Sequence, residues 1–213
     1  MNLPNKITVT RIVMIILMDI AIFVMAFIPF TAPDLGNSGI NLVYFIIAIL
    51  FVVAAATDCL DGQIARRCNL VTDLGKFLDP IADKLLNDSL LIFLLVPQAY
   101  APNQRADTMF LTILAVCVII MIGRDLIVDA LRLIAVKKNI VIAANIFGKA
   151  KTVLQMIAIP MLLLNDWPFS YFDSSWPQAL QISSIVFYLA TAMSLISGII
   201  YVYQNRVVLK GTK

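Results

Sequence analysis

Four aspartates in two closely spaced pairs are the residues of this chain best suited to chemistry. Asp58 and Asp61 stand three residues apart, and Asp79 and Asp83 stand four apart. Small residues and one arginine accompany the pairs, namely Gly62, Ala65, Gly75 and Arg66. If both segments are helical, the two carboxylates of each pair project from one face of their helix. Two such faces turned toward each other would form a cage of four carboxylates.

Carboxylate oxygens in such a cage favour a pair of divalent cations. Four like charges at the edge of a low-dielectric region repel one another unless cations bind between them. Carboxylates prefer magnesium, manganese or calcium to softer ions, and two metal ions about 3.5–4 Å apart can clamp the oxygens of a phosphoryl transfer. The guanidinium of Arg66 suits a phosphate oxygen. Single aspartates near a membrane surface are often helix caps or solvated residues, and we expect this of Asp73 and Asp107.

The composition excludes several other kinds of chemistry. The 213 residues include no histidine, and all 13 acidic residues are aspartate. Triads of serine or cysteine with histidine are therefore impossible, as are the histidine-rich sites of zinc hydrolases. The three cysteines form no Cys-x-x-Cys pair and indicate neither a disulfide framework nor a zinc site. A net charge of +3 gives little support to nucleic-acid binding.

The segments that must position the aspartates are strongly apolar. Hydrophobic residues make up 61% of the chain, against about 45–50% in a typical soluble protein. We therefore predict an all-α integral membrane protein with one domain over residues 1–213, in which a short interfacial N-terminal segment precedes six transmembrane helices. These helices are expected near residues 12–30, 42–62, 75–96, 109–132, 149–165 and 179–203. The third helix would carry Asp79 and Asp83 at the membrane edge.

The basic residues indicate how the helices are oriented. Fifteen of the 16 lie in the two termini, the second-to-third connection and the fourth-to-fifth connection, and only Arg105 lies in the three others. Because cytoplasmic loops carry an excess of lysine and arginine, we expect both termini, and an active site, on the cytoplasmic side of the cell membrane. Asp19 lies inside the first apolar segment, where we expect a helix–helix hydrogen bond.

The spacing of the aspartates is similar to the signature of a known enzyme family. The chain reads Asp58-x-x-Asp61-Gly62-x-x-Ala65-Arg66, then eight residues, then Gly75-x-x-x-Asp79-x-x-x-Asp83. This pattern resembles the signature of the CDP-alcohol phosphotransferase family at every position. The resemblance implies six membrane helices, a cytosolic active site and a homodimer among membrane lipids. It also implies transfer of a phosphatidyl group from CDP-diacylglycerol to an alcohol, with release of CMP.

The same resemblance implies roles for individual residues. Asp58, Asp61, Asp79 and Asp83 would bind two magnesium or manganese ions, and Asp83 would also be the general base that deprotonates the acceptor hydroxyl. The CDP portion of the donor would be held by Gly62, Ala65, Arg66 and Gly75, together with Asn5 and Thr8 of an N-terminal segment that resembles one branch of the family. Cys59 departs from the family pattern, in which an aromatic residue is common.

A second group of basic residues bears on the identity of the acceptor. The segments around Arg124, Arg132 and Lys149-Ala-Lys151 resemble the branch of the family that uses glycerol 3-phosphate. The four cations Arg124, Arg132, Lys149 and Lys151 could surround its phosphate, and the product would be phosphatidylglycerophosphate. Asp129 departs from that pattern and could pair with either arginine. The cations could instead follow the positive-inside rule or contact anionic lipids, which suits Lys137 and Lys138 better.

Other functions are also compatible with parts of the sequence. The same chemistry could use serine, inositol phosphate or a second phosphatidylglycerol molecule as the acceptor. A membrane cation transporter would likewise concentrate aspartates in its helices. A transporter needs polar groups along a path to both faces, whereas the motif acids and bases of this chain cluster at one face. A noncatalytic scaffold would not need four carboxylates in register with glycines.

Overall fold

The computed structural model describes residues 3–27, 35, 40–67, 72–96, 107–138, 140, 146–173 and 175–206. Nearly all of these residues are helical, which confirms the all-α prediction. The helices fall into two compact units, each described below by itself. The first unit comprises Met1–Arg105 and Ile159–Trp167, and the second comprises Ala106–Ala158 and Pro168–Lys213. The expectation of a single domain stays a prediction.

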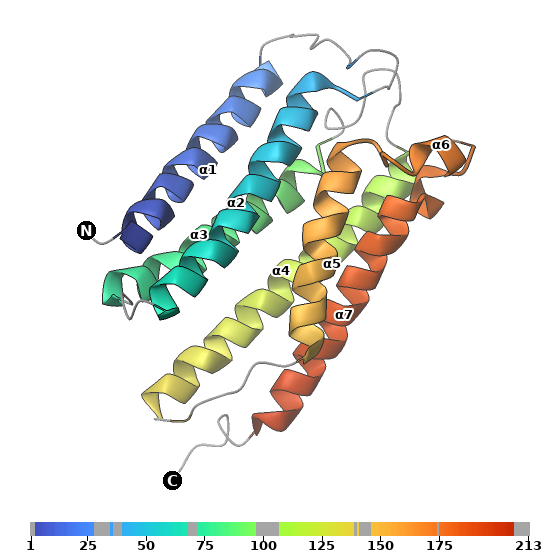
Figure 1. The fold of residues 1–213 in the computed structure, drawn as a ribbon. Helices are drawn as coiled ribbons and strands as arrows, with labels where there is room; N and C mark the ends of the chain where they lie inside the picture. The colour runs from blue at the N-terminus through green and yellow to red at the C-terminus, as the bar shows by residue number, and fades with distance from the viewer. Residues whose placement is uncertain are drawn as a thin grey trace. The chain divides into compact units, whose positions relative to one another are not determined.

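The first unit is built on α1 (Leu3–Phe27), α2 (Leu42–Arg67) and α3 (Asp73–Phe93), with α1 packed against both α2 and α3 (Figure 1). Thr72 caps α3, because its hydroxyl accepts a hydrogen bond from the N–H of Gly75 at 3.1 Å. Asp73 is therefore the first residue of this helix and not its cap. Pro80 lies inside α3, where it offers no N–H to the carbonyl of Lys76, yet the helix continues to Phe93.

α1 begins at Leu3, whereas we expected the first helix to begin near residue 12 after an interfacial segment. Its N-terminal residues Asn5, Thr8 and Arg11 are buried, and the opposite side of the helix exposes large apolar residues. Arg11 is 3% exposed, while Leu17 is 61% exposed. In a helix of a soluble protein, apolar side chains are mostly buried and charged ones exposed, so the pattern of α1 is the reverse. The polar N-terminal residues therefore belong to a helix that turns its polar side toward α2 and α3.

A partly buried polar contact also joins α1 to α3 further along the helices. The hydroxyl of Ser89 donates a hydrogen bond to Oδ2 of Asp19 at 2.9 Å. This contact confirms the helix–helix hydrogen bond expected for Asp19. Such a bond satisfies a polar group inside an apolar segment, where water is absent.

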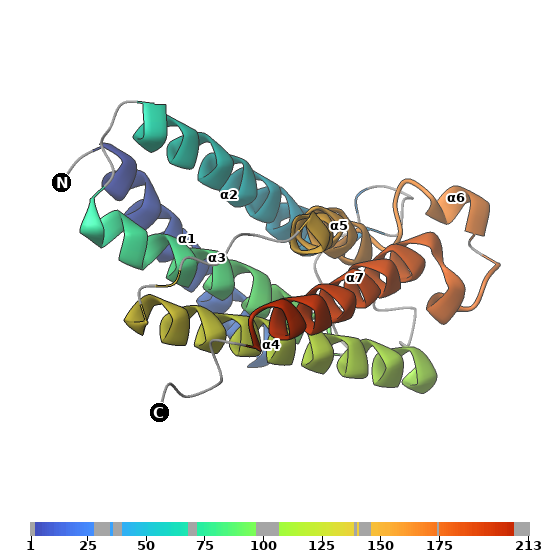
Figure 2. The ribbon, with the colours of Figure 1, turned by 90° about the horizontal axis from the view of Figure 1, so that it is seen from below.

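The second unit contains α4 (Thr108–Lys137), the first part of α5 (Ile146–Leu163), α6 (Ser170–Asp173), η2 (Gln178–Leu180) and α7 (Ile182–Gln204). α4 and α7 pack along each other and run in the same direction (Figures 1 and 2). Asp107 caps α4 by accepting from the N–H of Met109 at 3.2 Å, as expected. With 30 residues, α4 is about 45 Å long. It is longer than the hydrocarbon core of a bilayer, which is about 30 Å thick.

The connection between α5 and α7 carries both tryptophans of the chain. Trp167 and Trp176 are about half exposed, and α6 between them exposes Tyr171 and Phe172 more fully. Exposed aromatic side chains at the ends of apolar helices are typical of the membrane–water interface. Asp173 is buried, and its Oδ2 accepts from the N–H of Ile182 at 2.9 Å at the start of α7. The sequence pattern does not predict α6 or η2.

Four of the described helices are long and apolar enough to cross a membrane, namely Asn5–Val24, Thr108–Lys137, Ile146–Leu163 and Ile182–Gln204. α2 contributes a shorter apolar part, Leu42–Asp58. The chain is therefore a multi-pass membrane protein, as predicted. The number of six spans and the cytoplasmic position of both termini stay predictions.

Candidate active site

Asp58 and Asp79 come from different helices and contact the same face of α1. The guanidinium of Arg11 donates to Oδ1 of Asp58 on α2. One turn earlier in α1, the hydroxyl of Thr8 donates to Oδ1 of Asp79 on α3 at 3.0 Å. Both donors are buried, whereas Asp79 is exposed and the side chain of Asp58 is 39% exposed. α1 thus holds one carboxylate from each of the two aspartate pairs, from their buried side.

A second polar contact fixes the start of α3 against α1. Besides capping the helix, the hydroxyl of Thr72 donates to Oδ1 of Asn5 at 2.8 Å. A Cβ atom on Gly75 would lie 3.0 Å from this same oxygen and 3.3 Å from the hydroxyl of Thr72. Glycine therefore permits the close approach of the two helices here. Asn5 and Gly75, both assigned to the donor, lie together at this point, and Thr8 binds Asp79 one turn further along α3.

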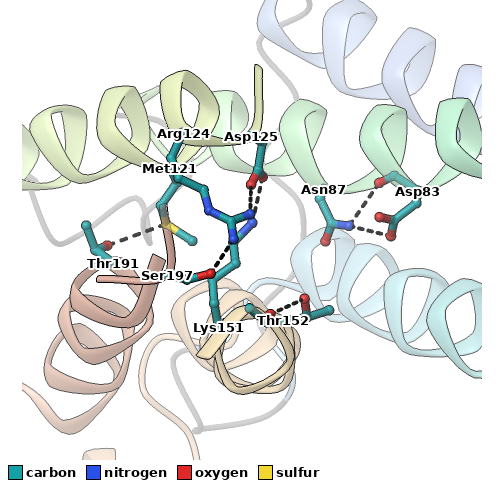
Figure 3. A network of polar contacts seen from close by, with 10 residues as sticks. Asp83, Asn87, Met121, Arg124, Asp125, Lys151, Thr152, Thr191 and Ser197 are labelled. Atoms are coloured by element: carbon teal, nitrogen blue, oxygen red, sulfur yellow. Dashed lines mark hydrogen bonds and ion pairs between the residues drawn. The ribbon is translucent and has the colours of Figure 1, made fainter. Parts of the chain in front are cut away.

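Asp83 is exposed on α3, one turn after Asp79, and it is held within its own helix. The side-chain amide of Asn87 donates to Oδ1 of Asp83 at 2.8 Å and to its main-chain oxygen at 2.9 Å (Figure 3). The hydrogen bond to Oδ1 restricts the rotation of the carboxylate, and the bond to the main-chain oxygen fixes the position of the amide. Asn87 thus has a role as a partner of the proposed general base, which its place in an apolar stretch does not reveal.

The metal site is described only in part. The backbone of Asp61, Gly62, Ala65 and Arg66 belongs to α2, but their side chains lie outside the part of the chain that the structure describes. Among the described side chains, no three potential metal ligands lie close enough to hold one ion. The chemistry of the donor set still fits magnesium or manganese, because Asp58, Asp79 and Asp83 offer only oxygen ligands on solvent-accessible sides of their helices.

In the second unit, one aspartate holds two of the predicted acceptor-binding cations. Asp125 accepts from Nη1 of Arg124 at 2.8 Å and from Nζ of Lys151 at 2.6 Å (Figure 3). The side chains of Arg124 and Lys151 are 14% and 8% exposed. The carboxylate compensates one of the two positive charges in this largely buried group. From the sequence, Asp129 could pair with Arg124 or with Arg132, and the acid that contacts Arg124 in the structure is Asp125.

The other two predicted acceptor-binding residues lie apart from the Asp125 group. Arg132 is exposed on α4, and its Nε donates to the hydroxyl of Tyr201 on α7 at 3.2 Å. Lys149 is exposed, and it has no hydrogen bond or ion pair with the residues that the structure describes. The structure therefore joins Arg124 to Lys151 but not to Arg132 or Lys149.

Sequence reasoning missed several residues that contact the predicted ones. Arg11, Thr72, Asn87 and Asp125 all bind predicted site residues, as do Ser197 and Tyr201 of α7. Some of these contacts join residues about fifty to seventy positions apart, such as Arg11 to Asp58 and Arg124 to Ser197. Spacing along one helix cannot reveal such pairs. The contact of Asn87 with Asp83 could have been predicted from the sequence, since residues four apart are neighbours on a helix.

Comparison with known proteins gives the class of this chain. The family model for CDP-alcohol phosphatidyltransferases matches residues 1–200. The chain belongs to this family, as the resemblance of its aspartate motif on α2 and α3 implied.

Several relatives with similar sequences carry the same name. The CDP-diacylglycerol–glycerol-3-phosphate 3-phosphatidyltransferase of Bacillus subtilis is 39% identical over 209 residues, which cover 98% of this chain and 97% of that protein. The protein of the same name from Mycoplasma pneumoniae is 36% identical and covers 95% of this chain and 87% of its own length. The one from Rickettsia bellii is 31% identical over 94% of this chain and 93% of its own length. The similarity thus extends over nearly the whole chain.

Proposed function

We propose that this protein transfers the phosphatidyl group of CDP-diacylglycerol to sn-glycerol 3-phosphate, giving phosphatidylglycerophosphate and CMP. The observation that carries the proposal is the meeting of Asp58 and Asp79 on one face of α1, held by Arg11 and Thr8. These carboxylates come from the two halves of the family motif, and their contacts leave them accessible to a ligand. Full-length relatives that carry the name of this activity support the same substrates.

Asp58, Asp61, Asp79 and Asp83 would hold two divalent ions, magnesium or manganese. Bound ions of this kind neutralise the charge on phosphate oxygens and so lower the barrier of phosphoryl transfer. The protein residues supply the remaining requirements. Thr8, Arg11 and Asn87 fix the orientation of three of the carboxylates, and Asn5, Gly62, Ala65, Arg66 and Gly75 are assigned to the CDP portion of the donor.

Asp83 is assigned to the proton of the acceptor. In the proposed step, the hydroxyl oxygen of glycerol 3-phosphate forms a bond to the phosphorus that carries the diacylglycerol. The bond between that phosphorus and the oxygen of CMP breaks, CMP leaves with the electron pair, and the hydroxyl proton passes to the carboxylate of Asp83. The amide of Asn87 donates to Oδ1 of Asp83, which keeps this group in a fixed orientation before the proton moves.

The acceptor is assigned from charge and from the relatives. Glycerol 3-phosphate carries a phosphate group that serine lacks, and Arg124, Arg132, Lys149 and Lys151 offer four positive charges for it. Lys151 and Arg124 are largely buried, which suits the binding of a ligand more than a general attraction to the membrane surface. We further propose six membrane spans, both termini in the cytoplasm, an active site facing the cytoplasm and a homodimer.

The experiment that tests the function is an assay of CMP release by the purified protein in detergent. The protein would be given CDP-diacylglycerol and magnesium with glycerol 3-phosphate, serine, inositol phosphate or phosphatidylglycerol, and a chelator would serve as the control. We expect release with glycerol 3-phosphate alone, and none with the chelator. Release with a different alcohol would keep the aspartate site and reject the acceptor. If the protein releases no CMP with any alcohol, the enzyme proposal is rejected and the transporter and scaffold hypotheses are favoured.

A further inference from the structure

The C-terminal half of α7 carries two side chains that hold the predicted acceptor arginines. Ser197 accepts a hydrogen bond from Nη2 of Arg124 at 2.5 Å, and Tyr201 accepts one from Nε of Arg132 at 3.2 Å. Both residues of α7 are buried, with exposures of 0% and 2%. They lie four residues apart, and therefore on one face of the helix. No family motif recognised in the sequence includes α7.

Two polar contacts and the space left by two glycines fix the side chain of Arg124. Besides Ser197, its guanidinium binds Asp125 at 2.8 Å (Figure 3). A Cβ atom at Gly198 would lie 2.7 Å from Cγ of Arg124, and one at Gly148 would lie 3.3 Å from its Nη2. Glycine at these positions leaves the room that the arginine occupies, since a Cβ at Gly198 would force the side chain to move. The conformation of the Arg124 side chain is thus fixed from Cγ to the guanidinium group.

Arg132 is held at one nitrogen only. Its Nε binds the hydroxyl of Tyr201, and its guanidinium carbon lies 5.8 Å from the centre of the tyrosine ring. Tyr201 packs among Val128 and Leu131 of α4, so its hydroxyl has a fixed position. The two terminal nitrogens of Arg132 make no hydrogen bond to the residues that the structure describes, and they carry four N–H donors. These donors suit the oxygens of a phosphate group.

The spacing of the two anchors differs from that of the two arginines. Arg124 and Arg132 lie eight residues apart on α4, a rise of about 12 Å, whereas Ser197 and Tyr201 lie four apart on α7, a rise of about 6 Å. Because α4 and α7 run in the same direction, two arginines two turns apart on α4 are anchored by two residues one turn apart on α7. Without the anchors, each long side chain would sample many rotamers.

We propose that Ser197 and Tyr201 are positioning residues for the phosphate monoester of the acceptor, acting through Arg124 and Arg132, and that Gly198 provides the space for Arg124. This inference rests on the proposed function, because it assigns these two arginines to the acceptor. It adds α7 to the elements that determine which alcohol is used. We do not expect the affinity for the CDP-lipid donor to depend on these residues.

The test is a comparison of Tyr201→Phe and Ser197→Ala with the parent protein in the CMP-release assay. Tyr201→Phe keeps the ring and removes only the hydroxyl. Since hydrogen bonds to charged groups are the stronger ones, we expect the KM for glycerol 3-phosphate to rise roughly tenfold in each variant, with kcat and the KM for CDP-diacylglycerol changed less than about twofold. Tyr203→Phe is the matched control, because Tyr203 is 66% exposed on the same helix and contacts Arg206.

A double-variant cycle separates positioning from a general structural effect. If Tyr201 acts through Arg132, Tyr201→Phe has no further effect on the KM for glycerol 3-phosphate once Arg132→Ala is present. Additive effects in the cycle, or equal increases in the KM values of both substrates, would overturn the proposal.

A binding measurement distinguishes failure of this inference from failure of the proposed function. Inorganic phosphate should raise the Tm of the purified parent protein, and raise it less in Tyr201→Phe, because a ligand that binds the folded state stabilises it. Phosphate could raise the Tm of the parent protein more than that of Tyr201→Phe while the parent protein releases no CMP with glycerol 3-phosphate. In that case the proposed acceptor is wrong, and Tyr201 still positions Arg132 for a phosphate group. If phosphate shifts the Tm of both proteins equally, or of neither, the positioning role is rejected.

Discussion

Buried donors hold the carboxylates of the candidate site, and this is where single residues matter most. Arg11 and Thr8 are each at most 3% exposed, although an arginine is seldom buried without partners. Each of them donates to a carboxylate of α2 or α3. Removing such a donor leaves its carboxylate in place but free to rotate. The expected defects therefore concern metal affinity and turnover more than folding.

Replacement of Asp83 by asparagine tests the assignment of the general base. The amide keeps the size of the side chain and cannot accept the proton, so we expect the turnover of CMP release to fall by about 10²–10⁴, with little change in Tm. Asp107→Asn is the control, since asparagine also serves as a helix cap. Near-normal turnover of purified Asp83→Asn protein would remove Asp83 from this role.

Thr8→Val tests whether α1 helps the site to bind metal ions. Valine keeps the shape of threonine and loses the hydrogen bond to Asp79. Because a hydrogen bond to a charged group contributes about 1.5–3 kcal/mol, the magnesium concentration for half-maximal activity should rise roughly tenfold. A magnesium titration of CMP release measures this, with Thr10→Val as the control, since Thr10 is exposed on the same helix. An unchanged titration would show that Thr8 only packs against α3.

The sequence predicts the positions of the helices better than it predicts the contacts between their side chains. The apolar stretches predict α2, α3, α4, α5 and α7 with their approximate bounds, because membrane helices need long apolar runs. They do not predict the start of α1, since Asn5, Thr8 and Arg11 form a polar segment in the sequence. These residues are buried only because α2 and α3 pack against them. The spacing of Asp58, Asp79 and Asp83 predicts them as site residues, and this assignment stays a prediction. Their partners could not be predicted from spacing, since tertiary packing alone brings Arg11 to Asp58.

The start of α3 offers a test at the scale of the helices. Thr72→Ala removes the cap of the helix and the contact with Asn5, and we expect the free energy of unfolding to fall by about 1 kcal/mol. The KM for CDP-diacylglycerol should rise as well, because Asn5 and Gly75 lie at this helix end. Thr72→Ser should preserve both values, as measured by thermal unfolding in detergent and by steady-state kinetics. If serine is as harmful as alanine, the methyl group of Thr72 is what matters.

At the scale of the whole molecule, the arrangement of the chain across the membrane underlies every other proposal. The fourth-to-fifth connection follows the basic end of α4 at Lys137, and the α5–α7 connection carries exposed aromatic residues and no basic residue. We propose that a bilayer separates these two segments, because basic residues favour the cytoplasmic side. This contrast motivates the proposed orientation of six spans with both termini inside.

Cysteine labelling in intact cells tests that orientation. In a variant whose three native cysteines are replaced by alanine, Ser175→Cys should react with a membrane-impermeant maleimide, and Lys137→Cys should react only after the cells are opened. Both positions are exposed in the second unit, so any difference in labelling reports the membrane barrier. Reaction of Lys137→Cys in intact cells would reverse the proposed orientation and place the basic residues outside.

The position of the two tryptophans has a spectroscopic consequence. Both Trp167 and Trp176 lie in the α5–α7 connection, and the chain has no other indole. Intrinsic emission excited at the red edge of protein absorption therefore originates from this one connection. Lipids with brominated acyl chains should quench it if the aromatic residues enter the bilayer interface. An emission change during unfolding will report this connection, and circular dichroism is needed to follow the helices.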